Sequence, residues 1–281
     1  MPSARLWIVA AALLFSTGGA AIKATSLGPA AVAAGRSLVA FAVLLAVTRG
    51  RGLRPRPLDL VTAGLYAATL VLYVFANRTT TAAAAVFLQG TAPLYLLFLA
   101  PLFLRERPGR RDLGLFLLMV VGLLGFFLAP GASQATAPRP LLGNALSAAS
   151  GLTWAGTVLG LRWLARDGSS PLPAVVTGNA LVVLVLLPFL EVPGSLDHSD
   201  VLVLLWLGVF QIAVAYLLAA RGMARVPAFQ ASLLFLLEPA FGPLWAWLFL
   251  RERPAALELA GGALILVAGL LAASRREPHS T

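Results

Sequence analysis

Two stretches of this sequence, 146 residues apart, are closely alike. Pro93–Pro108 reads PLYLLFLAPLFLRERP and Pro239–Pro254 reads PAFGPLWAWLFLRERP, so the last seven residues of the two are identical. Each stretch is an apolar run that ends in a short basic segment. The match predicts a chain built from two related halves, residues 1–130 and 140–275, followed by a tail of residues 276–281.

The composition predicts that the chain lies in a lipid bilayer. Hydrophobic residues make up 59% of the sequence and charged residues 11%, and the mean hydropathy is +0.89. A soluble domain carries about 25% charged residues. Apolar runs of 18 or more residues recur, and each is long enough as a helix to cross a hydrocarbon core of about 30 Å. A water-soluble fold is therefore excluded, and lipid is the expected surrounding.

Ten such runs are bounded by Arg, Pro, Gly and Asp, which predicts an all-α integral membrane protein with ten transmembrane helices. The predicted spans are 5–22, 29–47, 58–77, 81–104, 112–129, 141–162, 172–190, 200–220, 226–250 and 255–273. The first run also fits a cleavable signal peptide, which would leave nine spans and break the repeat. No connection is long enough to hold a soluble domain.

The distribution of basic residues predicts the orientation of the spans. If the N-terminus is cytoplasmic, fifteen arginines fall on the inside: Arg5, Arg49, Arg51, Arg54, Arg56, Arg105, Arg107, Arg110, Arg111, Arg162, Arg166, Arg221, Arg225, Arg275 and Arg276. Five basic residues fall outside: Lys23, Arg78, Arg139, Arg251 and Arg253. The positive-inside rule then favours cytoplasmic positions for both termini. Five spans per half is an odd number, so the two five-helix repeats are expected to be inverted, an architecture typical of alternating-access transporters.

These features resemble the EamA family of the drug/metabolite transporter superfamily. The resemblance rests on the stretch from Glu238 to Glu252, on the glycine-bearing helices after each Arg-Glu-Arg-Pro, and on the two five-helix repeats. It implies a cavity between the halves and export or exchange of amino acids, bases, related metabolites or toxic compounds. The family's glutamates near the ends of the fourth and ninth spans correspond to Glu106 and Glu252, and its intramembrane Glu-Pro to Glu238 and Pro239. The first half departs from this pattern, because Ala92 precedes Pro93.

Two ionisable residues fall at membrane depth, where a charge is costly unless it faces protein or water. Glu238 lies in the middle of an apolar run and is interpreted either as a proton-coupling or amine-binding group or as a packing carboxylate beside Pro239. A helical wheel places Ala231, Leu234, Gly242 and Trp245 on its side. Arg36, in the second span, is expected to snorkel to the interface. The alternatives for Arg36 are an ion pair with Glu238 and a contact with a substrate carboxylate.

Further candidates for the solute site are polar or aromatic. They are Gln89 and Gln211, for which interhelical hydrogen bonds are the alternative, and the aromatic residues Phe15, Tyr66, Tyr73, Trp154, Tyr216 and Trp245, which could instead be core. Pro93 and Pro239, with Pro101 and Pro243, are expected to kink their helices, and the first two are candidate hinges. Lys23 and Arg162 are expected to anchor helix ends at the interface. Gly114, Gly122, Gly125, Gly261, Gly262 and Gly269 are expected to allow close helix packing.

The sequence therefore predicts a secondary transporter that works as an exporter in a bacterial inner (plasma) membrane. Its expected partners are the lipid bilayer and a small-molecule solute; no nucleic acid, cofactor or metal is expected, because the arginines sit between apolar runs and no cysteine is present. Catalytic residues are not expected, since no metalloprotease or nucleophile-elbow motif occurs. A passive channel or a lipid-handling protein is the alternative. No motif specifies the oligomeric state or the substrate.

Overall fold

The computed structural model describes residues 4–50, 54–80, 82–128, 138–190, 197–250 and 256–274. Over these residues the chain is helical and contains no strand. The elements are α1 (Ala4–Ser16), α2 (Gly18–Ala24), α3 (Pro29–Thr48), α4 (Pro57–Thr79), α5 (Ala82–Gln89), α6 (Ala92–Leu99), η2 (Ala100–Leu104), α7 (Arg110–Leu128), α8 (Pro140–Arg166), α9 (Leu172–Leu186), η4 (Leu187–Phe189), α10 (His198–Trp206), η5 (Leu207–Val214), α11 (Ala215–Met223), α12 (Ala228–Phe235), α13 (Leu237–Leu250) and α14 (Ala256–Ala273).

Helices or pairs of helices lie over the spans predicted from the sequence. Six helical stretches of the described chain are long and apolar enough to cross a membrane: Ala4–Ala24, Pro29–Thr48, Pro57–Thr79, Ala84–Leu104, Leu172–Phe189 and His198–Met223. Two apolar stretches are shorter, Ala228–Phe241 and Leu259–Ala273. The all-helical membrane fold is confirmed, whereas the full set of ten crossings and their inverted arrangement stay a prediction.

The helix starts follow local chemistry. Pro29, Pro57 and Pro140 each occupy the first turn of a helix, where proline's missing N–H costs no hydrogen bond. The Asp59 carboxylate accepts a hydrogen bond from the backbone N–H of Arg56 at 2.8 Å and thereby caps α4. These helices therefore begin at well-defined positions directly after their connecting segments.

The distribution of polarity is the reverse of that in a soluble protein. Large apolar side chains point outward, with exposed fractions of 73% for Phe98, 69% for Leu270 and 64% for Leu184. Arg36 and Asn179, in contrast, are completely buried. Such an outer surface is compatible with lipid, and polar groups inside the bundle can then bond to one another.

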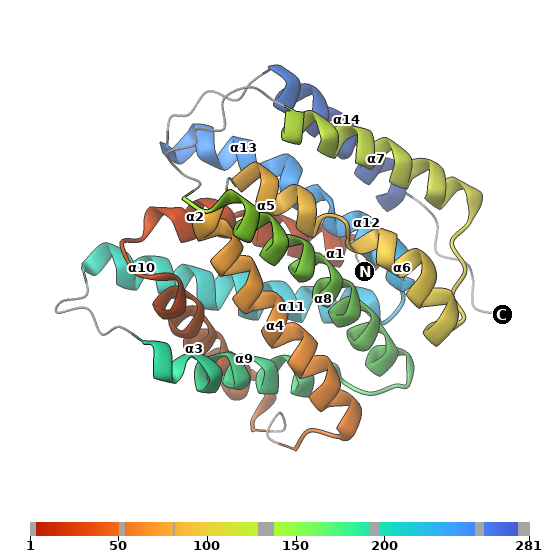
Figure 1. Ribbon diagram of the computed structural model, residues 1–281. Helices are drawn as coiled ribbons and strands as arrows, with labels where there is room; N and C mark the ends of the chain where they lie inside the picture. The colour runs from red at the N-terminus through yellow and green to blue at the C-terminus, as the bar shows by residue number, and fades with distance from the viewer. Residues whose placement is uncertain are drawn as a thin grey trace.

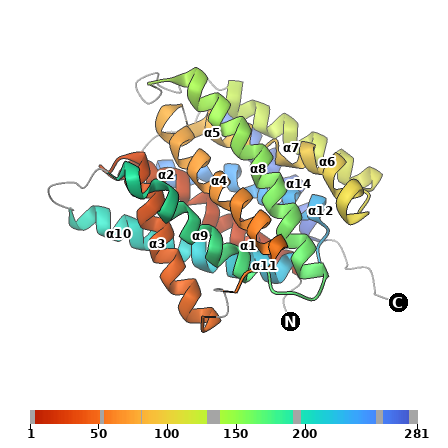
Figure 2. The ribbon, with the colours of Figure 1, turned by 60° about the horizontal axis from the view of Figure 1, so that its bottom comes forward.

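The interior of the bundle joins the two halves. The strongest packing pairs α4 with α8, α7 with α14, α4 and α3 with α9, and α1 with α11. Figure 1 and Figure 2 both show α7 and α14 side by side at one edge of the bundle, while α1, α4 and α8 run through its middle. The first helix is part of this core, since Ile8, Ala11 and Ala12 are fully buried.

Glycine allows α7 and α14 to approach closely. A Cβ on Gly122 would meet the Gly261 carbonyl oxygen at 2.7 Å, and one on Gly125 would meet the Leu257 carbonyl oxygen at 3.0 Å. The expectation for these glycines is confirmed. For Gly114 it is wrong, because a Cβ there would meet nothing within 4 Å and the residue faces outward.

Gly122→Ala is expected to destabilise the protein by about 1–3 kcal/mol, because the new methyl group collides with backbone that cannot rotate away. Gly114→Ala is the matched control, since it adds the same methyl group to the same helix in open space. Thermal unfolding of the purified proteins in detergent should lower the Tm of the first variant only. Equal Tm values for both would contradict the close contact of α7 and α14.

Candidate functional site

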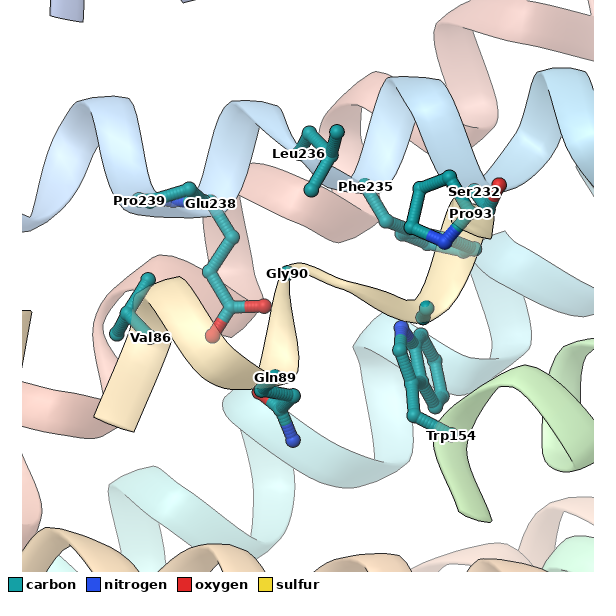
Figure 3. A pocket seen from close by; sticks show the side chains of 11 residues that line it. Val86, Gln89, Gly90, Pro93, Trp154, Ser232, Phe235, Leu236, Glu238 and Pro239 are labelled. Atoms are coloured by element: carbon teal, nitrogen blue, oxygen red, sulfur yellow. The ribbon is translucent and has the colours of Figure 1, made fainter. Parts of the chain in front are cut away.

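A cavity lies between two helices that break at equivalent positions. The α5–α6 span breaks at Gly90, and the α12–α13 span breaks at Leu236, which is 146 residues later, the offset of the sequence repeat. Pro93 and Pro239 follow three residues after each break, and each removes a backbone donor from its helix. Irregular turns of one or two residues therefore interrupt the regular helix just before each of these prolines, as expected for proline kinks. Figure 3 shows the two breaks facing each other across the cavity.

The cavity has a mostly apolar wall with three polar side chains. Its lining residues are Val86, Gln89, Gly90, Ala92, Pro93, Trp154, Ser232, Phe235, Leu236, Glu238 and Pro239. Its volume is about 20 Å³, which is room for about one water molecule. Gln89 donates a hydrogen bond to the Ser150 hydroxyl of α8 at 2.8 Å, so this glutamine both lines the cavity and joins two helices.

Glu238 is the acidic group of the cavity. It lies in the first turn of α13, and its carboxyl points across the cavity toward Gln89 and Gly90 (Figure 3). The Tyr73 hydroxyl donates a hydrogen bond to this carboxyl. Within the described residues, Glu238 forms no ion pair with a basic side chain. A carboxyl held by one neutral donor is free to bind a proton or a cationic group.

Five aromatic side chains fill the centre of the bundle beside the cavity. Phe15 contacts Trp154, Tyr216 and Phe235 with ring centroids 6.0, 5.0 and 5.8 Å apart. Tyr66 extends the cluster through Tyr216 at 4.8 Å, and Trp154 packs on Phe235 at 5.2 Å. The rings come from α1, α4, α8, α11 and α12, so both halves contribute. We call these five residues the aromatic cluster.

Arg36 is not placed as expected. The side chain is fully buried, so snorkelling to the interface is wrong. Its guanidinium donates to the Gln211 side-chain oxygen at 3.4 Å and to the Leu70 carbonyl at 3.2 Å. Arg36 is buried because its helix, α3, packs closely on η5 and α9.

Other predicted residues divide between core and cavity. Trp154, Gln89, Pro93, Glu238 and Pro239 line the cavity. Phe15, Tyr66, Tyr73, Gln211 and Tyr216 lie buried around it and do not line it.

Trp245 lies away from the cavity and donates a hydrogen bond from its indole to the Ser16 hydroxyl at 2.8 Å. It is seven residues beyond Glu238, which is about 10 Å along a helix. Ala231 and Leu234, which the helical wheel places on the side of Glu238, are buried and are not among the residues that line the cavity.

Sequence reasoning missed Ser232 and Phe235, which both line the cavity. The available signal was Pro239, whose missing N–H leaves the carbonyl four residues earlier, that of Phe235, without its helical partner. A helix interrupted there turns the residues just before the break toward the cavity. Periodicity alone could not show this, because it assumes an unbroken helix.

At one end of the bundle, a partly buried ion pair joins the two halves. Glu106 accepts hydrogen bonds from Arg162 at 2.8 Å and from the Ala228 backbone N–H at 2.8 Å. Arg162 also donates to the Met223 carbonyl at 2.7 Å. Arg162 thus bonds to Glu106 and to the end of α11, and its anchoring at the membrane interface stays a prediction. The repeat equivalent, Glu252, lies outside the described residues.

The opposite end is tied by another set of hydrogen bonds. Asp200 accepts from the Thr25 hydroxyl at 2.6 Å and from the Ser26 hydroxyl at 2.7 Å. Arg78 donates to the carbonyls of Thr25 and Leu27 at 3.0 and 2.6 Å. The connection between α2 and α3 is thus fixed to α10 and α4. Contacts between the two halves are therefore present at both ends of the bundle.

The fold and the cavity define a multi-pass membrane protein of the transporter class. The model of the EamA-like transporter family matches residues 2–128 and 141–274, and the chain belongs to this family. The protein is a membrane transporter and not an enzyme.

Relatives agree with this assignment. An uncharacterized transporter of Archaeoglobus fulgidus is 31% identical over 209 residues, 73% of this chain and 72% of the relative. The pseudopaline exporter CntI of Pseudomonas aeruginosa is 29% identical over 279 residues, 95% of each chain. A solved crystal structure with 22% identity covers 97% of this chain and 99% of its own, with a TM-score of 0.77, which shows a common fold.

Glu106→Gln is expected to loosen its end of the bundle, because it removes the charge that holds Arg162. A loss of about 1 kcal/mol from the free energy that favours the closed state raises the fraction of molecules open at this end about fivefold. The measurement is the labelling rate of a cysteine at the cavity residue Ser232 with a charged thiol reagent.

The matched control is Asp59→Asn, which removes the ion pair of Asp59 with Arg56 inside a single half. Its labelling rate should equal that of the parent. Labelling that rises equally in both variants would mean general loosening and not release of this contact.

Proposed function

We propose that the protein is a secondary transporter that exports small polar or amphipathic metabolites, such as amino acids, bases or related compounds, by alternating access. The observation that carries this proposal is the cavity between two helix breaks 146 residues apart, at matching positions of the repeat. A site shared by two equivalent elements can be exposed by either one. The name of the Pseudomonas aeruginosa relative, an exporter, supports the outward direction.

Paired contacts support two inverted five-helix repeats, residues 1–130 and 140–275. The packing of α4 on α8 has its counterpart in α11 on α1, and that of α4 on α9 in η5 on α3. The packing of α5 and α6 on α8 likewise matches that of α12 and α13 on α1. A two-fold relation between halves generates each such contact twice and leaves α3–α9 and α7–α14 as pairs of equivalent helices.

Transport requires the small cavity to expand. A small-molecule site occupies about 300–1,000 Å³, whereas this cavity holds about 20 Å³. The aromatic cluster must therefore separate to admit a solute. We assign the hinges to the breaks before Pro93 and Pro239, where the helices lack continuous hydrogen bonding. Glu106 with Arg162, and Asp200 with its partners, would then close opposite ends in turn.

Glu238 is the proposed coupling group. The chain lacks a phosphate-binding glycine loop, so an ion gradient or the solute's own gradient supplies the driving force. We place the protein in a bacterial plasma membrane with both termini cytoplasmic, as the arginine distribution indicates. A passive channel is the second candidate, which the proline breaks and the glutamate would also fit.

The inverted arrangement predicts that positions 52 and 135 lie on opposite faces of the membrane. Because the chain contains no cysteine, single-cysteine variants at these positions can be labelled in whole cells with an impermeant reagent. Position 135 should react from outside, and position 52 only after permeabilisation. Labelling of both from the same side would exclude the inverted repeat.

Purified protein in liposomes is expected to show saturable counterflow of at least one amino acid, base or cationic dye. Glu238→Gln should abolish the response of transport to an imposed proton gradient, because the amide cannot bind a proton. The parent protein and a Tyr73→Phe variant, which removes only the hydroxyl that bonds Glu238, serve as references that keep the carboxyl.

Unchanged proton dependence in the Glu238→Gln variant would assign this carboxyl to structure. Flux without saturation or counterflow would instead identify a channel.

A further inference from the structure

A fully buried arginine in the middle of this membrane protein has only neutral partners. The Arg36 side chain has no exposed surface, and its Nε atom has no hydrogen-bond partner. The two bonds it makes, to Gln211 and Leu70, are long at 3.4 and 3.2 Å. Ion pairs of the described residues join Arg56 to Asp59 and Arg162 to Glu106 and leave this guanidinium without a carboxylate. A buried charge without a counter-ion is costly, so the protein gains from an anion there.

The helix that faces Arg36 is irregular at the same place. Gln211 belongs to η5, a π-helical segment in the middle of its span, whereas the equivalent span of the first half, α4, is a regular α-helix. π-Helical segments are frequent at functional sites. The π-helical segment is therefore a second indication that the region around Arg36 has a functional role.

The two halves differ from each other at complementary charges. Arg36 is matched by Asn179 in the second half, and Glu238 by Ala92 in the first. Each half thus contributes one charge at a position where its twin is neutral. A role in packing does not require either charge, because the neutral twins pack within the same bundle: Asn179 is completely buried and Ala92 is 1% exposed.

The two charges lie near each other without pairing. Both charges are held by the same stretch of α4: Arg36 donates to the Leu70 carbonyl, and Tyr73, three residues further along this helix, donates to Glu238. Arg36 does not line the cavity, so the bundle must open before one solute can reach both charges.

We propose that Arg36 and Glu238 form the two ends of a binding site for a zwitterionic solute. The guanidinium binds the carboxylate or another anionic oxygen through its free Nε edge, and the Glu238 carboxyl binds the ammonium group. The aromatic cluster receives the apolar part of the solute. This inference rests on the proposed transport function and narrows its substrate class.

The test uses matched probes and the purified full chain in nanodiscs. The zwitterions are L-phenylalanine and L-leucine; phenethylamine and isoamylamine lack the carboxylate, and 3-phenylpropanoate and 4-methylpentanoate lack the ammonium group. Binding is measured by calorimetry and by the rise in Tm. At least one zwitterion should bind about tenfold or more tightly than both of its single-headed analogues, because each lost charged hydrogen bond costs about that factor.

Three variants assign the two ends. Arg36→Asn installs the residue of the twin position and should reduce the affinity for the zwitterion to that for the amine, with binding of the amine unchanged. Arg36→Lys should retain part of the preference. Glu238→Gln should show the reverse pattern, with the zwitterion reduced to the affinity of the acid.

The measurement on the parent protein decides the matter even if a variant fails to fold. A zwitterion bound no better than its analogues overturns the inference. Counterflow of a base or a dye with no response to either zwitterion also overturns it and leaves the proposed transport function standing. Loss of zwitterion binding in Arg36→Asn with equal loss of amine binding in a folded protein would show a structural arginine and contradict the assignment.

Discussion

The surrounding lipid requires every buried polar group of this protein to find its partner inside the bundle. Water cannot satisfy backbone or side-chain groups in the hydrocarbon core, so polar residues are drawn inward and apolar ones are left outside. Arg36, Asn179 and Ser150 are accordingly buried, while Phe98 and Leu270 face outward. The interhelical bonds that result, such as that of Asn179 to the Tyr66 hydroxyl at 2.8 Å, hold helices of different halves in one arrangement.

The same constraint makes a helix break expensive unless it borders a cavity. Proline frees a carbonyl that only a neighbouring helix or water can satisfy. In the described part of the chain, the breaks at Gly90 and Leu236 border the same small cavity. The cavity has three polar side chains. Gln89 and Ser232 lie in the helical turn before each break, and Glu238 directly precedes Pro239. Irregular backbone and functional chemistry are thus found together for one physical reason.

Duplication explains the framework, and departures from duplication explain the chemistry. Helix contacts recur in matched pairs, and the two broken spans align without a gap. The charges do not recur, since Arg36 corresponds to Asn179 in the sequence repeat and Glu238 corresponds to Ala92. Symmetric packing can support the exchange between two exposed states, whereas recognition of an asymmetric solute needs asymmetric charges. The contacts at the ends of the bundle follow a similar logic, because Glu106 joins elements of both halves.

The sequence by itself determined the helical membrane fold, the offset of 146 residues and the family, because hydropathy and repetition are local properties of the chain. It also identified Gln89, Trp154 and Glu238 as cavity residues, because polar and aromatic groups at membrane depth need a special environment. Only the tertiary structure decided that Arg36 is buried, that Arg162 bonds to Glu106 and that Trp245 lies outside the cavity. These outcomes depend on which helices pack together and where a helix is interrupted, and neither is encoded in the periodicity of a single span.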